Sequence, residues 1–141
     1  MPGRSLDHAG LETLSFDTCL RLLASVPLGR VCFIADGEVQ VLPVNHMVDG
    51  QDVVFRTAYG SKLYAADGQR PVTFEADDYD ERTHSGWSVV VNGRAEPVDE
   101  DAEIDRLAAS GLRPWVETVE RPFWVRIRPS SVTGRRTPRP S

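Results

Sequence analysis

Two Asp-Gly pairs, Asp36-Gly37 and Asp49-Gly50, constrain the fold more than any other feature of this sequence. Asp36-Gly37 is a strong hairpin signal, because both central positions of a tight two-residue turn favour such residues. Asp49-Gly50 is expected to turn the chain again. The segments that the pairs join, 30–35, 38–48 and 52–58, are rich in β-branched and aromatic residues, which favour strands. The first half of the chain is therefore predicted to form consecutive antiparallel strands.

Three further strands are predicted at 71–76, 86–98 and 122–128, and residues 132–136 can extend the last of them. A polar loop is expected over 77–85, and Gly93 indicates a kink or bulge suited to closing a barrel. One helix is predicted from Ser15 to Val26, with Phe16, Cys19, Leu20 and Leu23 on its buried face, and another over 99–110, capped by Asp99. The predicted fold class is mainly β, a small antiparallel barrel of six strands with flanking helices.

The length of 141 residues suits one domain, which we place at 14–136 between a loose segment at 1–13 and a tail at 137–141. No apolar run is long enough to span a bilayer and no secretory leader is recognisable, so a cytoplasmic protein is expected. The two cysteines, Cys19 and Cys32, are interpreted as small core residues in a reducing compartment. The net charge of −5 disfavours general nucleic-acid binding.

The segment 53–63 joins a strand to features that suit a phosphate. Gly60 permits a sharp turn, Ser61 can cap a short helix, and Lys62 is the only lysine in the chain. A helix N-terminus adds free N–H groups and a partial positive charge, so together these groups would form a phosphate cradle. An ordinary strand, turn and helix with a solvated lysine explains the segment equally well.

A second candidate position is Pro43, which lies inside a predicted strand but cannot donate to a strand ladder. It implies an edge or a bulge, so the backbone of 43–45 could meet a ligand or could simply be irregular. The acidic residues of 77–81 match no calcium loop, and neither His46 nor His84 belongs to a cluster of ligands. No Ser-His-Asp order is present, so the sequence predicts no metal site and identifies no catalytic residue.

Several segments carry, in order, a resemblance to a known family. They are a leading helix, Gly29-Arg30-Val31-Cys32-Phe33, Leu42-Pro43-Val44-Asn45, Phe55-Arg56-Thr57 with Gly60-Ser61-Lys62, Gly86-Trp87-Ser88-Val89-Val90-Val91-Asn92-Gly93, and Phe123-Trp124-Val125-Arg126-Ile127. Over residues 14–136 the chain resembles the pyridoxamine 5'-phosphate oxidase-like family of flavin-binding split barrels. It is most similar to the short actinobacterial-type members and to the nitroimidazole-resistance proteins.

The resemblance implies a homodimer that binds FMN at the subunit interface and acts on a small molecule. Ser61 and Lys62 would hold the phosphate, and Trp124 would pack near the ring from either subunit. The complete set of implied cofactor-binding residues is Pro43, Val44, Asn45, Arg56, Thr57, Gly60, Ser61, Lys62, Trp87, Ser88 and Trp124. Because Trp124 shares a strand face with two arginines, it is also the candidate interface residue.

The sequence departs from true pyridoxamine phosphate oxidases in two respects. The C-terminal strand lacks the histidine of their arginine–histidine pair, so oxidation of vitamin B6 is not expected. The cradle has one cation where the oxidases have two, which leaves a deazaflavin as an alternative cofactor. The predicted function is an FMN-dependent oxidoreductase acting on a small organic acceptor. The alternatives are a non-catalytic flavin-, deazaflavin- or haem-binding dimer, and a dimer with an empty site.

Overall fold

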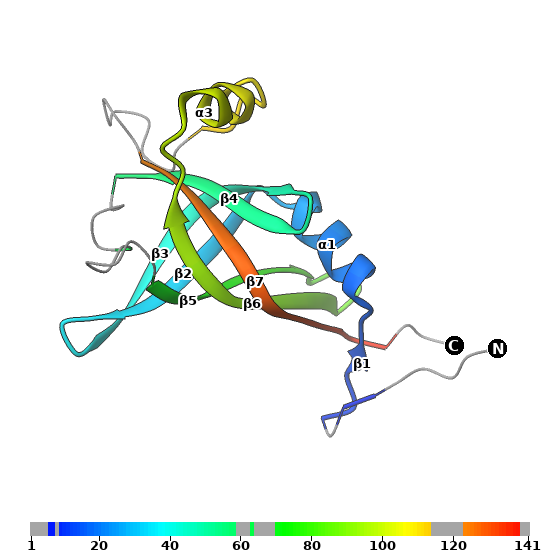
Figure 1. Cartoon of the computed structure of the whole chain (residues 1–141). Helices are drawn as coiled ribbons and strands as arrows, with labels where there is room; N and C mark the ends of the chain where they lie inside the picture. The colour runs from blue at the N-terminus through cyan, green and yellow to red at the C-terminus, as the bar shows by residue number, and fades with distance from the viewer. Residues whose placement is uncertain (1–5, 8, 59–62, 64–69, 114–122, 139–141) are drawn as a thin grey trace.

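A computed structural model describes residues 6–7, 9–58, 63, 70–113 and 123–138 (Figure 1). Two helices and seven strands form within them. In chain order they are β1 (Glu12–Thr13), α1 (Phe16–Ser25), β2 (Leu28–Ala35), β3 (Glu38–Asp49), β4 (Asp52–Thr57), β5 (Arg70–Asp80), β6 (Ser85–Pro97), α3 (Asp101–Ala108) and β7 (Phe123–Arg136). The described strands and helices therefore correspond closely to those predicted from turn and periodicity signals.

Six of the strands close into an antiparallel ring. The order is β7-β4-β3-β2-β5-β6, and β6 pairs in turn with β7 to complete the circle. The two-residue β1 pairs with the end of β7 outside the ring, so the sheet has seven strands rather than the predicted six. A strand this short carries no recognisable sequence pattern, and it forms because β7 offers it an unpaired edge.

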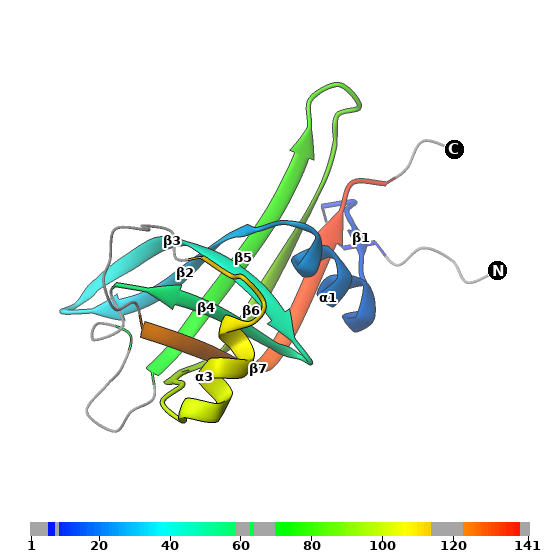
Figure 2. The ribbon, with the colours of Figure 1, turned by 90° about the horizontal axis from the view of Figure 1, so that it is seen from above.

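Two hairpins, β2–β3 and β5–β6, connect neighbouring strands of the ring. Asp36 and Gly37 have φ of 54° and 77°, the two positive values that their turn requires, so this predicted hairpin is confirmed. The predicted polar loop at 77–85 is wrong, because residues 77–80 continue β5 and only 81–84 turn. Eleven registered residue pairs join β5 to β6, and this long pairing outweighs the low strand propensity of the acidic residues. The resulting hairpin extends past the ring (Figure 2).

The predicted irregularity at Gly93 is confirmed. Asn92 pairs with Ser131 and Gly93 pairs with Pro129, so Ser130 is an extra residue on β7. A Cβ atom on Gly93 would overlap the carbonyl oxygen of Arg128, which is why the strands can approach only at a glycine. This bulge bends the β6–β7 ladder and allows β7 to continue without a break to Arg136.

The ring is filled by its own side chains. The largest fully buried ones include Phe55, Phe74, Leu63 and Ile127, which belong to one cluster. Helix α1 covers this core with Cys19 and Leu23, as predicted, but Phe16 is 40% exposed because it is the first residue of the helix. Among the described residues, no helix is long and apolar enough to cross a membrane.

A second, smaller cluster lies outside the ring, under α3. It consists of Val54, Leu107 and Trp124, with Met47, Val98, Ile104 and Leu112 packed against it. Helix α3 begins one residue later than predicted, with Glu100 rather than Asp99 at its N-cap, and no side chain caps it. Packing against the sheet, rather than a capping interaction, therefore sets where this helix begins.

We predict that Gly93→Ala lowers the free energy of unfolding by about 1–3 kcal/mol, because the added methyl group has no space beside the β7 backbone. Urea unfolding measures this loss. Gly37→Ala is the matched control: its Cβ meets no atom within 4 Å, and only its positive φ opposes the change, at a cost of about 1 kcal/mol. Equal stability of Gly93→Ala and the unaltered protein would contradict the steric explanation.

Candidate functional site

Residues predicted to bind a cofactor meet where β3 and β4 separate. His46 and Phe55 form the pair of the β3–β4 ladder that lies farthest from the connecting turn. Asn45 and Arg56 lie just beyond this pair, at the same end of the ladder. Side chains alternate across a strand, and the buried Val44 and Thr57 occupy the inner face. Pro43, Asn45 and Arg56 therefore share the outer face, and only the backbone of Val44 can take part in a site there.

Arg56 is the cation on this outer face. Its guanidinium carbon lies 4.8 Å from the centre of the Trp124 ring, and its Nη1 donates to the carbonyl oxygen of Leu112 at 3.2 Å. Its Nε is buried and has no hydrogen-bond partner. Within the described part of the chain, no carboxylate forms an ion pair with Arg56.

Trp124 fills the second cluster and does not face solvent. It is 6% exposed and lies opposite Arg56 in the ladder between β4 and β7. Its own chain covers the ring, so Trp124 fills the cluster under α3 rather than the interior of the barrel. Its contact with the Arg56 guanidinium still brings it to the edge of the site.

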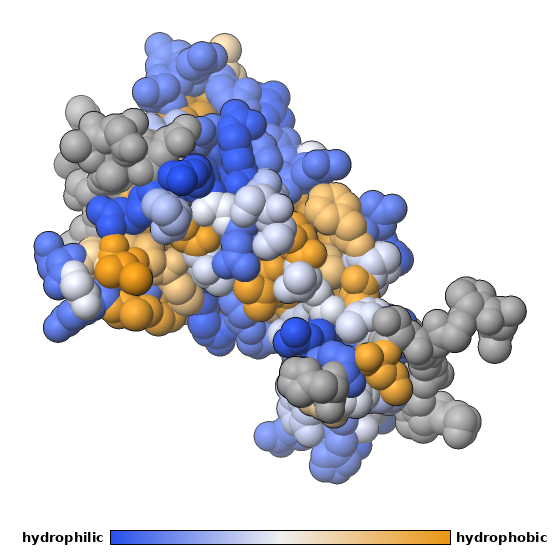
Figure 3. All heavy atoms as spheres, turned by 60° about the horizontal axis from the view of Figure 1, so that its bottom comes forward, coloured by the Kyte–Doolittle hydropathy of each residue, from blue (hydrophilic) through white to orange (hydrophobic). Residues whose placement is uncertain are grey.

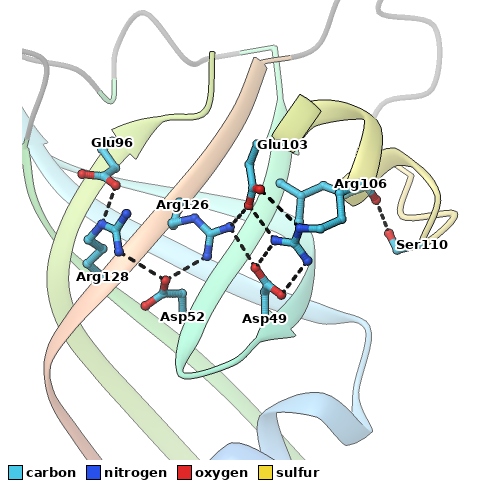
Figure 4. A network of polar contacts seen from close by, with 9 residues as sticks. Asp49, Asp52, Glu96, Glu103, Arg106, Ser110, Arg126 and Arg128 are labelled. Carbon is cyan, nitrogen blue, oxygen red and sulfur yellow. Dashed lines mark hydrogen bonds and ion pairs between the residues drawn. The ribbon is translucent and has the colours of Figure 1, made fainter. Parts of the chain in front are cut away.

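A network of ion pairs surrounds Arg126, two residues after Trp124 on β7 (Figure 4). Arg126 of β7 is 8% exposed and contacts three carboxylates, those of Asp49 at 2.8 Å, Asp52 at 2.8 Å and Glu103 at 2.7 Å. Arg106 of α3 joins Asp49 at 2.7 Å and Glu103 at 2.6 Å. The network therefore connects α3 to β3, β4 and β7.

The network lowers the pKa of two carboxyl groups, those of Asp49 and Glu103. Hydrogen bonds from Arg106, and then from Arg126, lower the pKa of Asp49 to about 2. A hydrogen bond from Arg106 also lowers the pKa of Glu103. Both groups are thus ionised throughout the neutral range, and the attachment of α3 is expected to weaken only in acid.

Trp87 and Ser88 lie at the opposite end of the molecule. They pair with Arg136 and Arg135 on β7, whereas Trp124 is near the start of that strand. Twelve residues of extended chain separate Trp124 from Arg136, about 40 Å at 3.3 Å per residue. Figure 2 shows the far end of the β5–β6 hairpin pointing away from α3. One chain therefore does not bring the two groups of predicted residues together.

Ser88 has a charged neighbourhood of its own. It lies opposite Asp77, which together with Glu75 forms ion pairs with Arg30, at 3.5 Å and 3.2 Å. Burial raises the pKa of Glu75 to about 7, and a hydrogen bond with Asp77 adds to the rise. The raised pKa thus belongs to Glu75, whose neighbour Asp77 lies opposite Ser88.

The predicted phosphate cradle falls outside the part of the chain that the structure describes. Gly60, Ser61 and Lys62 lie outside the described residues, although Leu63 next to them is buried in the core. His46 is also buried, with its Nε2 2.7 Å from the Leu23 carbonyl oxygen, whereas His84 is exposed in the β5–β6 turn. The described residues contain no group of three side chains that could hold a metal ion.

Sequence reasoning placed Arg126 on the strand face of Trp124 but did not predict its burial. The neighbouring Trp124 on the same face was the available signal, because an apolar ring on the outside of a barrel needs a cover. The covering helix then buries Arg126 as well. The contact of Leu112 with Arg56 had no signal in the sequence, since it uses a backbone carbonyl group.

A family model described as pyridoxamine 5'-phosphate oxidase matches residues 15–136. The chain belongs to this family. Its ring of six antiparallel strands with flanking helices agrees with the split barrel that the sequence resemblance implied.

Relatives support the same assignment. The uncharacterised protein Rv0080 of Mycobacterium tuberculosis is 40% identical over 128 residues, which cover 87% of this chain and 83% of the relative. A Corynebacterium glutamicum structure named for the pyridoxamine 5'-phosphate oxidases is 36% identical, with a TM-score of 0.79 over 89% of this chain and 97% of that one. The structure of an FAD binding protein from Mycobacterium smegmatis is 38% identical, with a TM-score of 0.71 over the same shares.

The ion network predicts how stability depends on pH. Asp49 has a lowered pKa in the folded state, so its contribution is present above about pH 4, the unfolded value, and is lost as pH falls toward 2. Asp49→Asn should therefore lower the free energy of unfolding by about 1 kcal/mol at pH 7, after solvent screening, and by progressively less in acid. Urea unfolding at pH 7, 4 and 3 measures the difference. Asp105→Asn, on the exposed side of α3, is the control, and a pH-independent difference would contradict the assignment.

Proposed function

We propose that this protein binds a flavin nucleotide and uses it as an oxidoreductase on a small organic acceptor. The observation that carries the proposal is Arg56, a guanidinium on the outer face without a carboxylate partner among the described residues. It lies at the end of the strand that leads into Gly60, Ser61 and Lys62. The 38% identical FAD binding protein supports a flavin as the ligand. The visible absorption spectrum of the purified protein tests the proposal directly.

The residues present fit such a ligand. Arg56 would offset the negative charge of a phosphate, Asn45 offers an amide on the same face, and Pro43 leaves one side of its strand without a donor. A bound flavin supplies hydride and electron transfer, so the protein needs to orient the ring and exclude water rather than provide a general base. This agrees with the lack of a catalytic triad in the sequence.

FMN is the flavin that the resemblance to the family implies, and FAD is the second candidate. The FAD binding protein of Mycobacterium smegmatis covers 89% of this chain, which favours FAD over a deazaflavin. Titration with riboflavin, FMN, FAD and a deazaflavin separates these ligands. Haem is the remaining alternative: of its two candidate ligands, His46 uses its Nε2 within the core, whereas His84 is exposed in the β5–β6 turn. The absence of a histidine from β7 still speaks against oxidation of vitamin B6.

We also propose a homodimer with the flavin between the subunits. The ring is filled by side chains, so the ligand needs a cover outside it. Val39 and Val41 continue the outer face of Pro43 along β3, and they are 69% and 56% exposed, while Ile34 opposite Val39 is 63% exposed. Figure 3 shows apolar side chains gathered near this hairpin, at the left of the view. A second subunit is the proposed cover.

Lys62→Met tests the phosphate cradle. A charge-assisted hydrogen bond contributes about 1.5–3 kcal/mol, so the affinity for FMN should fall about tenfold to a hundredfold. Riboflavin lacks the phosphate, and its affinity should hardly change. Methionine keeps most of the apolar side chain, so the fold should persist. Fluorescence titration measures both flavins, and equal losses for the two, or no loss for FMN, would remove Lys62 from the phosphate site.

Mixing two variants tests the shared site. Arg56→Met and Trp87→Ala each damage both sites of a homodimer. If the two residues come from different subunits, each mixed dimer keeps one intact site, and about a quarter of all sites should bind flavin normally after exchange. Titration of the mixture against each variant alone measures the recovery. No recovery, in a mixture shown by mass to contain mixed dimers, would mean that a single chain provides both residues.

A further inference from the structure

The segment that contains α3 contacts Arg56 directly through Leu112 and indirectly through Trp124 of β7. The carbonyl oxygen of Leu112, four residues beyond the end of α3, accepts a hydrogen bond from Arg56 at 3.2 Å. Trp124, which packs with Leu107 of α3, lies under the Arg56 guanidinium at 4.8 Å. The orientation of Arg56 therefore depends on where α3 lies on the barrel.

The position of α3 depends in turn on its ion pairs. The helix has eight residues, too few to be stable alone, and its N-cap residue forms no side-chain hydrogen bond. Glu103 bonds Arg126 of β7 at 2.7 Å, and Arg106 bonds Asp49 of β3 at 2.7 Å (Figure 4). Of these two helix residues, Glu103 is the one that contacts the buried arginine.

We propose that Glu103 is a positioning residue for Arg56. By fixing α3 on Arg126, it holds Leu112 and Trp124 where they orient the Arg56 guanidinium toward the phosphate of the bound flavin. This inference rests on the proposed flavin function and extends it, because Glu103 is part of the outer ion network and not of the flavin site. Its effect passes through packed side chains and one backbone hydrogen bond.

Glu103→Gln is a mild change for the fold. Arg126 keeps Asp49 and Asp52, both at 2.8 Å, so the substitution leaves no unpaired buried charge. Glutamine has almost the same size and helix propensity as glutamate. The matched control is Glu96→Gln, which removes the 2.5 Å ion pair with Arg128 at the other side of the network and does not involve α3.

The experiment measures FMN and riboflavin affinity for the unaltered protein, Glu103→Gln and Glu96→Gln. We expect Glu103→Gln to weaken FMN binding about threefold to tenfold, with riboflavin affinity and the urea midpoint nearly unchanged. Glu96→Gln should leave both affinities unchanged. A merely structural role for Glu103 would weaken both flavins equally or neither, and either result would overturn the inference.

A double-variant cycle provides the second readout. In an Arg56→Met background, Glu103→Gln should cause no further loss of FMN affinity, because the residue that it positions is gone. Additive losses would overturn the inference. Failure of the unaltered protein to bind any flavin would instead refute the proposed function, and the inference with it. A normal wild-type affinity together with an unaffected Glu103→Gln variant would refute the inference alone.

Discussion

The pairing of β7 with both β4 and β6 is the constraint on which the rest of the structure depends. It closes the ring, so that β7 has a neighbouring strand on each side where the ring closes. It also divides the residues of β7 between two environments, since Val125 and Ile127 enter the filled interior while Trp124 and Arg126 point outward. An indole ring and a guanidinium side by side on the outside need a cover that is both apolar and acidic, and α3 is such a cover.

The burial of Arg126 explains why its partners are so numerous. A buried guanidinium loses hydration, and a single carboxylate rarely compensates for that loss. Here three carboxylates surround it, and Arg106 binds two of them from the exposed side. Such an arrangement adds little to stability in comparison with a well-packed apolar contact, but it fixes geometry, because each partner restricts the others. The value of the network therefore lies in where it places α3, and through α3, the residues beside the site.

Much of this fold is encoded in local signals. The Asp36-Gly37 turn, the bulge at Gly93 and the apolar alternation of β6 predict the antiparallel ring, because each depends on residues close in sequence. The acidic end of β5 and the N-terminus of α3 were predicted wrongly, since cross-strand pairing and packing on the sheet decide them. In the site, the shared outer face of Asn45 and Arg56 follows from alternation once β3 and β4 are paired. The distance of Trp87 from Trp124 does not follow from alternation, because it depends on the length of the whole β6–β7 ladder.

The location of the site has a consequence for how such a protein can change its ligand. Because the ring interior is filled by Phe55, Phe74 and their neighbours, no ligand specificity can arise there without loss of the fold. The outer face is different: Asn45 and Arg56 belong to rigid strands, whereas α3 and Leu112 belong to the connection between β6 and β7. Changes in that connection can move a cation beside the ligand while the barrel stays the same. If the proposed flavin binds there, selectivity among riboflavin, FMN and FAD, which differ beyond the ribityl chain, is most easily adjusted through the segment that holds Arg56 in place.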